Sequence, residues 1–161
     1  MKNIRVQFLL VVYKMTQVVY RRSFKRKKRH WQFTAEQLLN FQEDSLGRKL
    51  GEFYRKHGFS MIPTMENHDV HHLITGCGTR FEQEIAMQYL LLGNGKVNAH
   101  LLAAIMLGTL ILPEYLKLYR QSYLKGRRMR TFYHLDFEEL LWHNYEHLKD
   151  FLSRKNDPVL Y

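Results

Sequence analysis

The sequence contains little cysteine and little proline, and both shortages restrict the fold. Its 161 residues include one cysteine, Cys77, so no disulfide can form within the chain, which fits a reducing compartment. Three prolines and nine glycines are too few for the many turns of an all-β protein. Apolar residues, at 45%, are sufficient to form a core. The composition therefore predicts an intracellular, globular, all-α protein.

Acidic residues are absent from the first thirty positions, which contain ten lysines and arginines. The remaining residues carry fifteen basic and fifteen acidic side chains, so the net charge of +10 comes from the N-terminal segment. A neutral body with a cationic arm favours an anionic partner, either a phospholipid surface or a nucleic acid. We therefore divide the chain into a basic N-terminal helix and arm, residues 1–33, and a single helical domain, residues 34–161.

Long hydrophobic runs are also absent. The runs at residues 8–13 and 101–112 are both shorter than the roughly 20 residues that cross a bilayer. Apolar residues before position 20 recur at helical spacing, which predicts an amphipathic helix that lies on a membrane surface or packs as a first core helix. The segment 101–112 is apolar on every side, so a central core helix is the favoured prediction and a lipid-lined tunnel is the alternative.

Helix boundaries are predicted from capping residues and glycines. The predicted starts, each at a residue that caps well, are Thr34, Asp44 or Ser45, Asn67, Thr79 and Asp136. A glutamine or glutamate three residues after three of them completes a capping box: Thr34 with Gln37, Thr79 with Glu82, and Asp136 with Glu139. The predicted ends are Gly58, Gly76, residues 93–95 and Pro113. These signals predict one bundle of six to eight helices, the last over residues 137–152.

Titratable side chains are concentrated at residues 68–72, where three histidines and an aspartate occupy five positions. His68 and His72 are four residues apart, so both imidazoles project from one face of a helix, as in helical zinc sites. Asp69 lies about 100° further around the helix. Asp69 therefore either binds the metal directly, near the helix end, or holds one of the metal ligands in its orientation without binding the metal itself.

A further ligand is expected from the following helix. Gly76 and Gly78 let the chain reverse, which returns Glu84 to the neighbourhood of the histidines. Glu82 is the competing carboxylate, but its place in a predicted capping box leaves Glu84 as the better candidate. The segment 68–84 is therefore interpreted as a metal site with four candidate ligands.

Other histidines and the cysteine receive simpler interpretations. His71 points away from the face of His68 and His72, and Cys77 is a lone cysteine between glycines, so both are interpreted as packing or surface residues. A second array with helical spacing lacks distinctive surroundings and is given no metal role: Glu139, His143 and His147.

His68, Asp69, His72 and Glu84 form the pattern H-D-x-x-H-x11-E. This pattern resembles the metal signature of the coenzyme Q biosynthesis protein 4 family, which belongs to the ubiquinone pathway. The flanking sequences LGRKLGEFYRKHGF and EIAMQYLL are similar to the family as well. The resemblance covers roughly residues 34–155.

The resemblance implies an all-helical protein in which His68, Asp69, His72 and Glu84 bind zinc or another divalent first-row metal. It implies that segment 85–112 contacts an isoprenoid-like lipid. Proteins of the family are regarded as scaffolds or as the proteins that remove the ring C1 carboxylate of a polyprenyl-hydroxybenzoate. The second role would make the chain a metal-dependent carboxy-lyase that performs an oxidative decarboxylation, with Asp69 as proton acceptor.

The resemblance also implies partners and a location. The expected partners are a prenylated lipid or quinone precursor, an anionic membrane surface, other quinone-biosynthesis enzymes and a second copy of the chain. No mitochondrial transit peptide is recognisable, which favours a bacterial-type member that is cytoplasmic and peripheral on the inner face of the cytoplasmic membrane. The segment after Asp136 is only loosely similar to the family.

Three alternatives remain at the level of the sequence. The first is a non-catalytic scaffold in which zinc braces two helices while a groove holds the prenyl tail. The second is a metal-dependent hydrolase, although zinc proteases place Glu after the first His and phosphohydrolases need a further His and Asp, for which His57 and Asp136 lack pattern support. The third is a nucleic-acid binder using residues 21–29, which lacks a recognisable module, so nucleic acid is not an expected partner.

Overall fold

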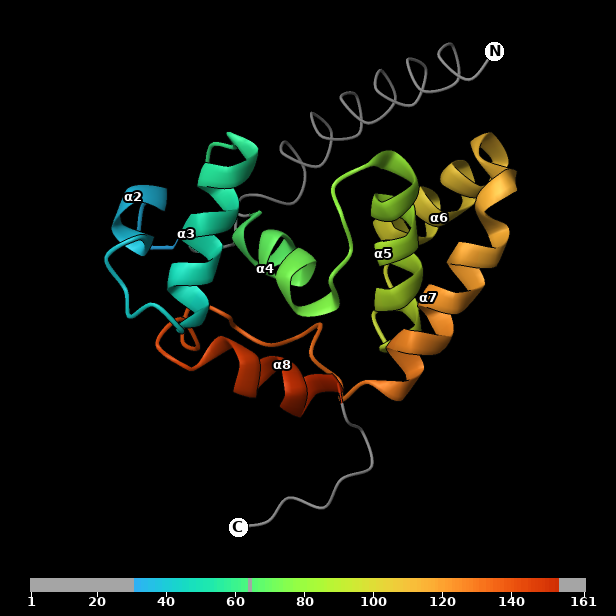
Figure 1. Ribbon diagram of the computed structural model, residues 1–161. Coiled ribbons are helices and arrows are strands. Elements are labelled where there is room, and N and C mark those ends of the chain that lie inside the picture. The colour runs from blue at the N-terminus through green and yellow to red at the C-terminus, as the bar shows by residue number, and fades with distance from the viewer. Residues whose placement is uncertain (1–30, 64, 154–161) are drawn as a thin grey trace.

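The computed structural model describes residues 31–63 and 65–153, so the predictions for the basic arm before residue 31 lie outside the described residues. The described chain folds into seven α-helices and one short 3-10 helix, without a strand in these ranges (Figure 1). The elements are α2 (Ala35–Leu38), α3 (Leu46–His57), α4 (Glu66–Thr75), α5 (Phe81–Gly93), α6 (Ala99–Ile111), η2 (Pro113–Tyr115), α7 (Leu116–Arg128) and α8 (Tyr145–Ser153). The prediction of an all-α fold with six to eight helices is confirmed.

Several helix ends form where the sequence predicts them. The Thr34 hydroxyl and the Gln37 side chain form a reciprocal capping box at α2, and the Ser45 hydroxyl accepts from the Arg48 N–H at the start of α3. Gly58 and Gly76 end α3 and α4 with φ of 62° and 68°, which glycine adopts without the steric cost of a Cβ.

The predicted caps of the helices that carry His68 and Glu84 are wrong. Helix α4 begins at Glu66, one residue before Asn67, whose Oδ1 instead accepts from the Phe137 N–H at 3.2 Å. Helix α5 begins at Phe81 without a side-chain cap, and Glu82 forms an ion pair with Arg80 at 2.8 Å in place of the predicted capping box. In both cases one side chain of the predicted cap, Asn67 or Glu82, has a different partner.

The predicted last helix over residues 137–152 is also wrong, because residues 137–144 form turns and α8 starts at Tyr145. Backbone groups of these turns pair with the start of α3: the Leu46 N–H donates to the His143 carbonyl and the Tyr145 N–H to the Asp44 carbonyl, at 2.9 and 2.7 Å. These bonds replace helical ones. Consequently the spacing of Glu139, His143 and His147 does not correspond to one helical face.

Helix α5 lies between α4 and α7 (Figure 1) and contributes the buried residues Met87, Leu90 and Leu91 to the main core. Its contact with α7 is very close: a Cβ at Gly93 would overlap a backbone carbonyl of α7, and a Cβ at Gly126 would overlap that of Leu90. The buried Asn94 amide then joins the two helix ends by donating to the carbonyls of Gly126 and Arg130 at 3.3 and 2.9 Å. Helix α5 is therefore firmly held on its α7 side.

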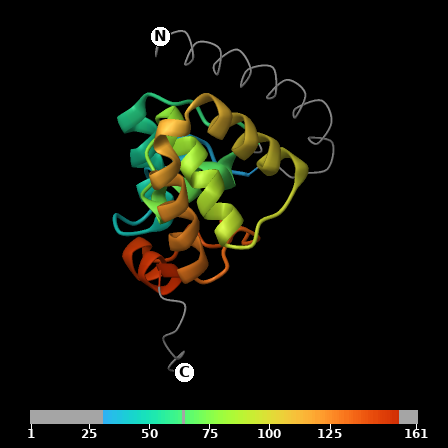
Figure 2. The ribbon, with the colours of Figure 1, turned by 90° about the vertical axis from the view of Figure 1, so that its right-hand side faces the viewer.

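Helix α6 does not occupy the centre of the core, so the favoured prediction for residues 101–112 is wrong. It lies at the edge of the molecule (Figure 2), and only Leu101 and Gly108 among its residues are buried. Leu102, Met106 and Leu110, spaced four residues apart, are 46%, 64% and 73% exposed. Gly108 packs on Ile85 of α5. The helix thus contacts the body along a narrow strip and presents an apolar row outward.

The described residues bear on membrane crossing through the length and apolar character of their helices. None of their helices alone combines the length and apolar character needed to cross a bilayer. The pair Ala99–Ile111 and Pro113–Arg128, bent by 104°, meets the criteria of length and composition when taken together.

Candidate metal centre

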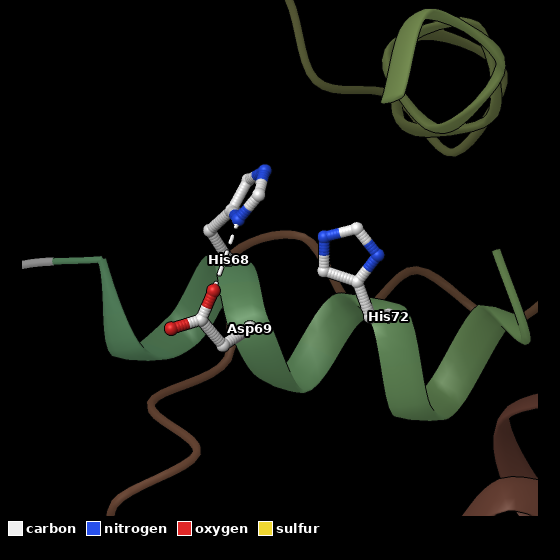
Figure 3. A group of neighbouring side chains, drawn as sticks. All are labelled: His68, Asp69 and His72. Atoms are coloured by element: carbon white, nitrogen blue, oxygen red, sulfur yellow. Dashed lines mark hydrogen bonds and ion pairs between the residues drawn. The ribbon is translucent and has the colours of Figure 1, made fainter. Parts of the chain in front are cut away.

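Helix α4 presents the two histidines of the motif on one side. Figure 3 shows the rings of His68 and His72 projecting from the same side of α4, with their centroids 4.9 Å apart. The Asp69 carboxylate lies near His68, and its Oδ1 is 3.3 Å from Nδ1 of that ring. One potential ligand atom from each of the three residues lies within 4.8 Å of the others. The arrangement follows from the i, i+4 spacing on a regular helix.

Glu84 from the first turn of α5 completes the cluster. Its Oε2 is 3.3 Å from Nε2 of His68, and its Oε1 is 3.1 Å from Nε2 of His72. One carboxylate therefore contacts both imidazoles across the gap between α4 and α5. The structure brings together all four residues that the sequence proposed as ligands, including the carboxylate sixteen positions after His68.

The orientation of His72 is fixed by a backbone group. Its Nδ1 is 3.0 Å from the Cys77 carbonyl oxygen, which can only accept, so Nδ1 carries the proton that is donated. Nε2 is then the nitrogen that faces Glu84 and that a metal could bind. Metal-binding histidines are commonly oriented in this way by a carbonyl on the opposite nitrogen.

Asp69 has a partner that the sequence analysis missed. The Tyr54 hydroxyl on α3 donates to Asp69 Oδ2 at 2.8 Å, and Tyr54 is 2% exposed. Burial and the neighbouring Asp69 charge raise the pKa of Tyr54, so the hydroxyl stays protonated and donates. No sequence signal links Tyr54 to the motif, because the two residues meet only through the packing of α3 on α4.

The cluster strongly perturbs the pKa values of two of its members. Burial lowers the pKa of His68, but hydrogen bonds to Asp69 and Glu84 outweigh it and raise the pKa to about 9. Burial raises the pKa of Glu84, but hydrogen bonds to His68 and His72 outweigh it and lower the pKa to about 2. Without a metal, a protonated His68 therefore pairs with an ionised Glu84 near neutral pH.

The donor set fits a divalent first-row metal. Two imidazole nitrogens and two carboxylates are ligands that zinc accepts, and His72 and Asp69 each have an orienting partner in Cys77 and Tyr54. The protonated His68 provides the positive charge in the cluster, and a metal cation could take the place of its proton. The residues therefore fit the ion that the motif implies.

The cluster opens into a pocket of about 370 Å³. Its polar lining comes mainly from His68, Asp69, His72, Thr79 and Glu84. Its apolar lining consists of Phe53, Phe59, Ile62 and Met65, and the Phe53 ring stacks on His72 with centroids 5.8 Å apart. A ligand with a polar head and an apolar body could contact both parts.

Comparison with known proteins identifies the family. The family model described as coenzyme Q (ubiquinone) biosynthesis protein Coq4 matches residues 59–156, which include all four residues of the cluster. The chain belongs to the Coq4 family. Its role therefore lies in ubiquinone biosynthesis. Among curated proteins, no match was found.

A solved structure supports the fold of this Coq4-family protein. The chain is similar to a candidate ubiquinone biosynthesis protein from Nostoc punctiforme PCC 73102, with a TM-score of 0.63 and 15% sequence identity. The similarity covers 75% of this chain and 68% of the other. At this level of identity it shows that the two chains share a fold.

The remaining candidate residues of this Coq4-family chain lie elsewhere. His71 is buried, and its ring contacts Phe132 and Phe137 with centroids 5.6 and 5.7 Å away. Cys77 contributes its backbone carbonyl to the site, while burial raises the pKa of its thiol. Within the described ranges, the metal-type cluster does not include His57 or Asp136. The residues suggested for a hydrolase are therefore not gathered around the motif.

Proposed function

We propose that this protein binds zinc, or another divalent first-row metal, through His68, His72, Glu84 and Asp69, and that the bound metal acts on a prenylated hydroxybenzoate at a membrane surface. The observation that carries the proposal is the Glu84 carboxylate in contact with Nε2 of both histidines. Four such groups from two helices converge where the motif requires them.

The residues of the cluster have separate tasks in this proposal. His72 is held by Cys77, and Asp69 by Tyr54, so neither needs to reorient when a cation binds. When bound, the metal supplies Lewis-acid polarisation of a phenol or carboxylate oxygen and stabilises negative charge that develops on the ring. Asp69 is the proposed acceptor of the phenol proton, since its carboxylate lies at the wall of the pocket.

The proposed reaction removes the C1 carboxylate of the ring. The bond between C1 and the carboxylate carbon breaks, carbon dioxide leaves, and the electron pair stays on the ring carbon. In the simple decarboxylation a proton from solvent takes the vacated position. In the oxidative form, dioxygen and a two-electron donor are the co-reactants, a hydroxyl group takes that position, and the second oxygen atom leaves as water.

The prenyl tail and the membrane are proposed to meet the apolar surfaces of the chain. Phe59 and Ile62 line the pocket and are 46% and 39% exposed, so an apolar path leads outward from the cluster. The exposed row Leu102, Met106 and Leu110 of α6 offers a further surface for lipid, and residues 85–113 contain no acidic side chain. These features support a peripheral position on the cytoplasmic membrane, together with the basic arm.

The test is turnover by the purified, metal-loaded protein. A polyprenyl-hydroxybenzoate with a short tail is supplied with dioxygen and a reductant, and the product is measured by mass spectrometry. We expect the ring carboxylate to be lost, and we expect Glu84→Ala or a chelator to abolish the loss. Glu82→Gln is the matched control on the same helix turn. Unchanged turnover in the Glu84→Ala protein would refute the proposal.

A non-catalytic scaffold is the second candidate, and the same carboxylate favours it. Because Glu84 connects α5 to both histidines of α4, a cation there would brace the two helices. In this case metal removal lowers the melting temperature and the binding of prenyl lipid, while the substrate is unchanged under all conditions. Turnover and lipid binding measured on one sample distinguish the two candidates.

A further inference from the structure

A second pocket, of about 340 Å³, lies beside the metal-site pocket, and the two share Phe59 and Ser60. Its aromatic lining comes from Trp31, Phe33 and Phe59, and its acidic lining from Glu36 and Glu66. None of the described residues that line it is a lysine, arginine or histidine. This pocket, called here the Glu66 pocket, is therefore aromatic and acidic.

The Glu66 carboxylate is the unusual feature of this pocket. Glu66 is 4% exposed, and no hydrogen bond or ion pair joins its side chain to another of the described residues. Its position as the first residue of α4 provides a partial positive charge from the helix end. A carboxylate that keeps so little contact with water is stabilised by an ion or by strong hydrogen-bond donors.

We propose that the Glu66 pocket binds an organic cation, either a primary ammonium or a guanidinium group. Such a cation is attracted by the faces of aromatic rings and pairs with a carboxylate, and the pocket offers both. A divalent metal is a poorer match, because the other described lining residues are mostly aromatic or aliphatic and supply few oxygen ligands. The inference goes beyond the proposed function and does not depend on metal binding.

The cation has two candidate sources with the same chemistry. It can be a free amine from solution, or a lysine or arginine side chain of the chain itself. The cluster at residues 25–29 consists of five consecutive basic residues and is separated from Trp31 by one residue in the sequence. Both sources satisfy the Glu66 carboxylate, so the experiment has one arm for each.

The test follows the two tryptophan indole N–H signals of the full-length protein by ¹H–¹⁵N NMR. Trp31 lines the Glu66 pocket and Trp142 does not, so the second signal is an internal control. The probes are n-butylammonium and methylguanidinium chlorides, with 1-pentanol as the neutral analogue. We expect the cations to shift the Trp31 signal saturably and 1-pentanol to leave it in place. A shift that is equal with 1-pentanol would overturn the proposal.

Variants assign the shift to the carboxylate. Glu66→Gln, which keeps the shape and removes the charge, is expected to raise the dissociation constant at least tenfold, and the exposed Glu139→Gln to leave it unchanged. If Glu66→Gln does not fold, Phe59→Leu replaces it, since Phe59 is 46% exposed and is not part of the buried core. It is expected to weaken binding at least threefold. Unchanged affinity in the folded pocket variant contradicts the inference.

A variant with residues 25–29 all changed to glutamine identifies the source. If the basic cluster of the chain itself fills the pocket, it competes with the probes in the wild type. The probes then bind the wild type with a dissociation constant at least tenfold higher than the one for this variant. If the cation comes from solution, both proteins bind the probes equally. Either result sustains a cation site at Glu66, and absence of a saturable Trp31 shift in both proteins overturns it.

Discussion

Helix α5 has two contrasting sides. On the α7 side, Gly93 and Gly126 bring the two helix backbones into contact, and Asn94 joins their ends by hydrogen bonds. On the α4 side, the carboxylate of Glu84 meets His68 and His72 across a gap that opens into a pocket. The α7 side is packed without space for a methyl group, and the α4 side is held by contacts between a carboxylate and two imidazoles.

The difference explains how a carboxylate from a separate helix can be placed accurately beside the two histidines. The entropic cost of positioning the Glu84 side chain is reduced because α5 is already fixed by its contact with α7 on the opposite side. The α4 side can then remain polar and accessible, as a binding site requires. The face of α5 toward α7 is therefore rigid, and the face toward α4 carries the polar side chain of the candidate site.

The largest expected effect concerns the packed side. Gly126→Ala places a methyl group against the Leu90 carbonyl, which is backbone and cannot rotate away, so we expect a loss of about 3 kcal/mol in the free energy of unfolding. Gly58→Ala is the control, because nothing lies near a Cβ there and only its φ of 62° costs about 1 kcal/mol. Urea unfolding of both variants measures the difference. Equal losses would show that the close contact is unimportant.

The next effect concerns the charged side. Glu84→Gln removes the charge that contacts both imidazoles, and we expect zinc affinity to fall about a hundredfold, or about 2.7 kcal/mol. Competition with a chromophoric chelator gives the affinity. Glu82→Gln, in the same turn of α5, should bind zinc as the wild type does. Similar affinities for the two variants would exclude Glu84 as a ligand.

A smaller effect is expected from the group behind Asp69. Tyr54→Phe removes the hydroxyl that donates to Asp69 Oδ2, and zinc affinity should fall about tenfold. Tyr145→Phe is the matched control, since its hydroxyl donates to the Leu73 carbonyl outside the cluster. Both variants are measured by the same chelator competition. If Tyr145→Phe weakens zinc binding equally, the effect is a general one on folding.

A further prediction concerns the pH dependence of zinc binding. The pKa of His68 is raised from 6.5 to about 9, so zinc must displace its proton, and affinity should rise about tenfold per pH unit between pH 7 and 9. Calorimetry in two buffers of different ionisation enthalpy should detect the released proton. A pH-independent affinity would contradict the raised pKa.

The metal-free protein should show the linked stability effects. The stabilisation from His68 is complete below pH 6.5 and is lost as the pH rises through about 9. The lowered pKa of Glu84 has the opposite consequence, because its stabilisation is present above pH 4.5 and is lost as the pH falls through about 2. The pair therefore contributes most between pH 4.5 and 6.5.

The sequence predicted which four side chains meet better than it predicted the helices around them. Helical spacing and a glycine turn were sufficient to bring Glu84 to His68 and His72, although the capping box used to set aside Glu82 does not form. Capping patterns fail where a tertiary partner competes, as it does for Asn67 and Phe137. Tyr54 was out of reach because its contact depends on how α3 packs against α4.

Helix α6 is a second case in which the sequence alone did not predict the surroundings of a residue. An apolar sequence predicts burial, yet burial depends on what the rest of the chain can place around it. Residues such as Leu110 remain exposed because α6 contacts its neighbours along one strip only. The composition of α6 therefore indicated that the helix needs apolar surroundings. It did not indicate whether other parts of the protein provide them.

The hydrogen bonds that join residues 143–145 to the beginning of α3 have a consequence for dissecting this chain. The segment matching the family runs from residue 59 to residue 156, whereas α3 and Tyr54 precede it. A fragment cut at that boundary would leave the Asp69 carboxylate without its donor and the 143–145 loop without its anchor. The recognisable stretch of sequence is thus shorter than the smallest piece expected to fold autonomously.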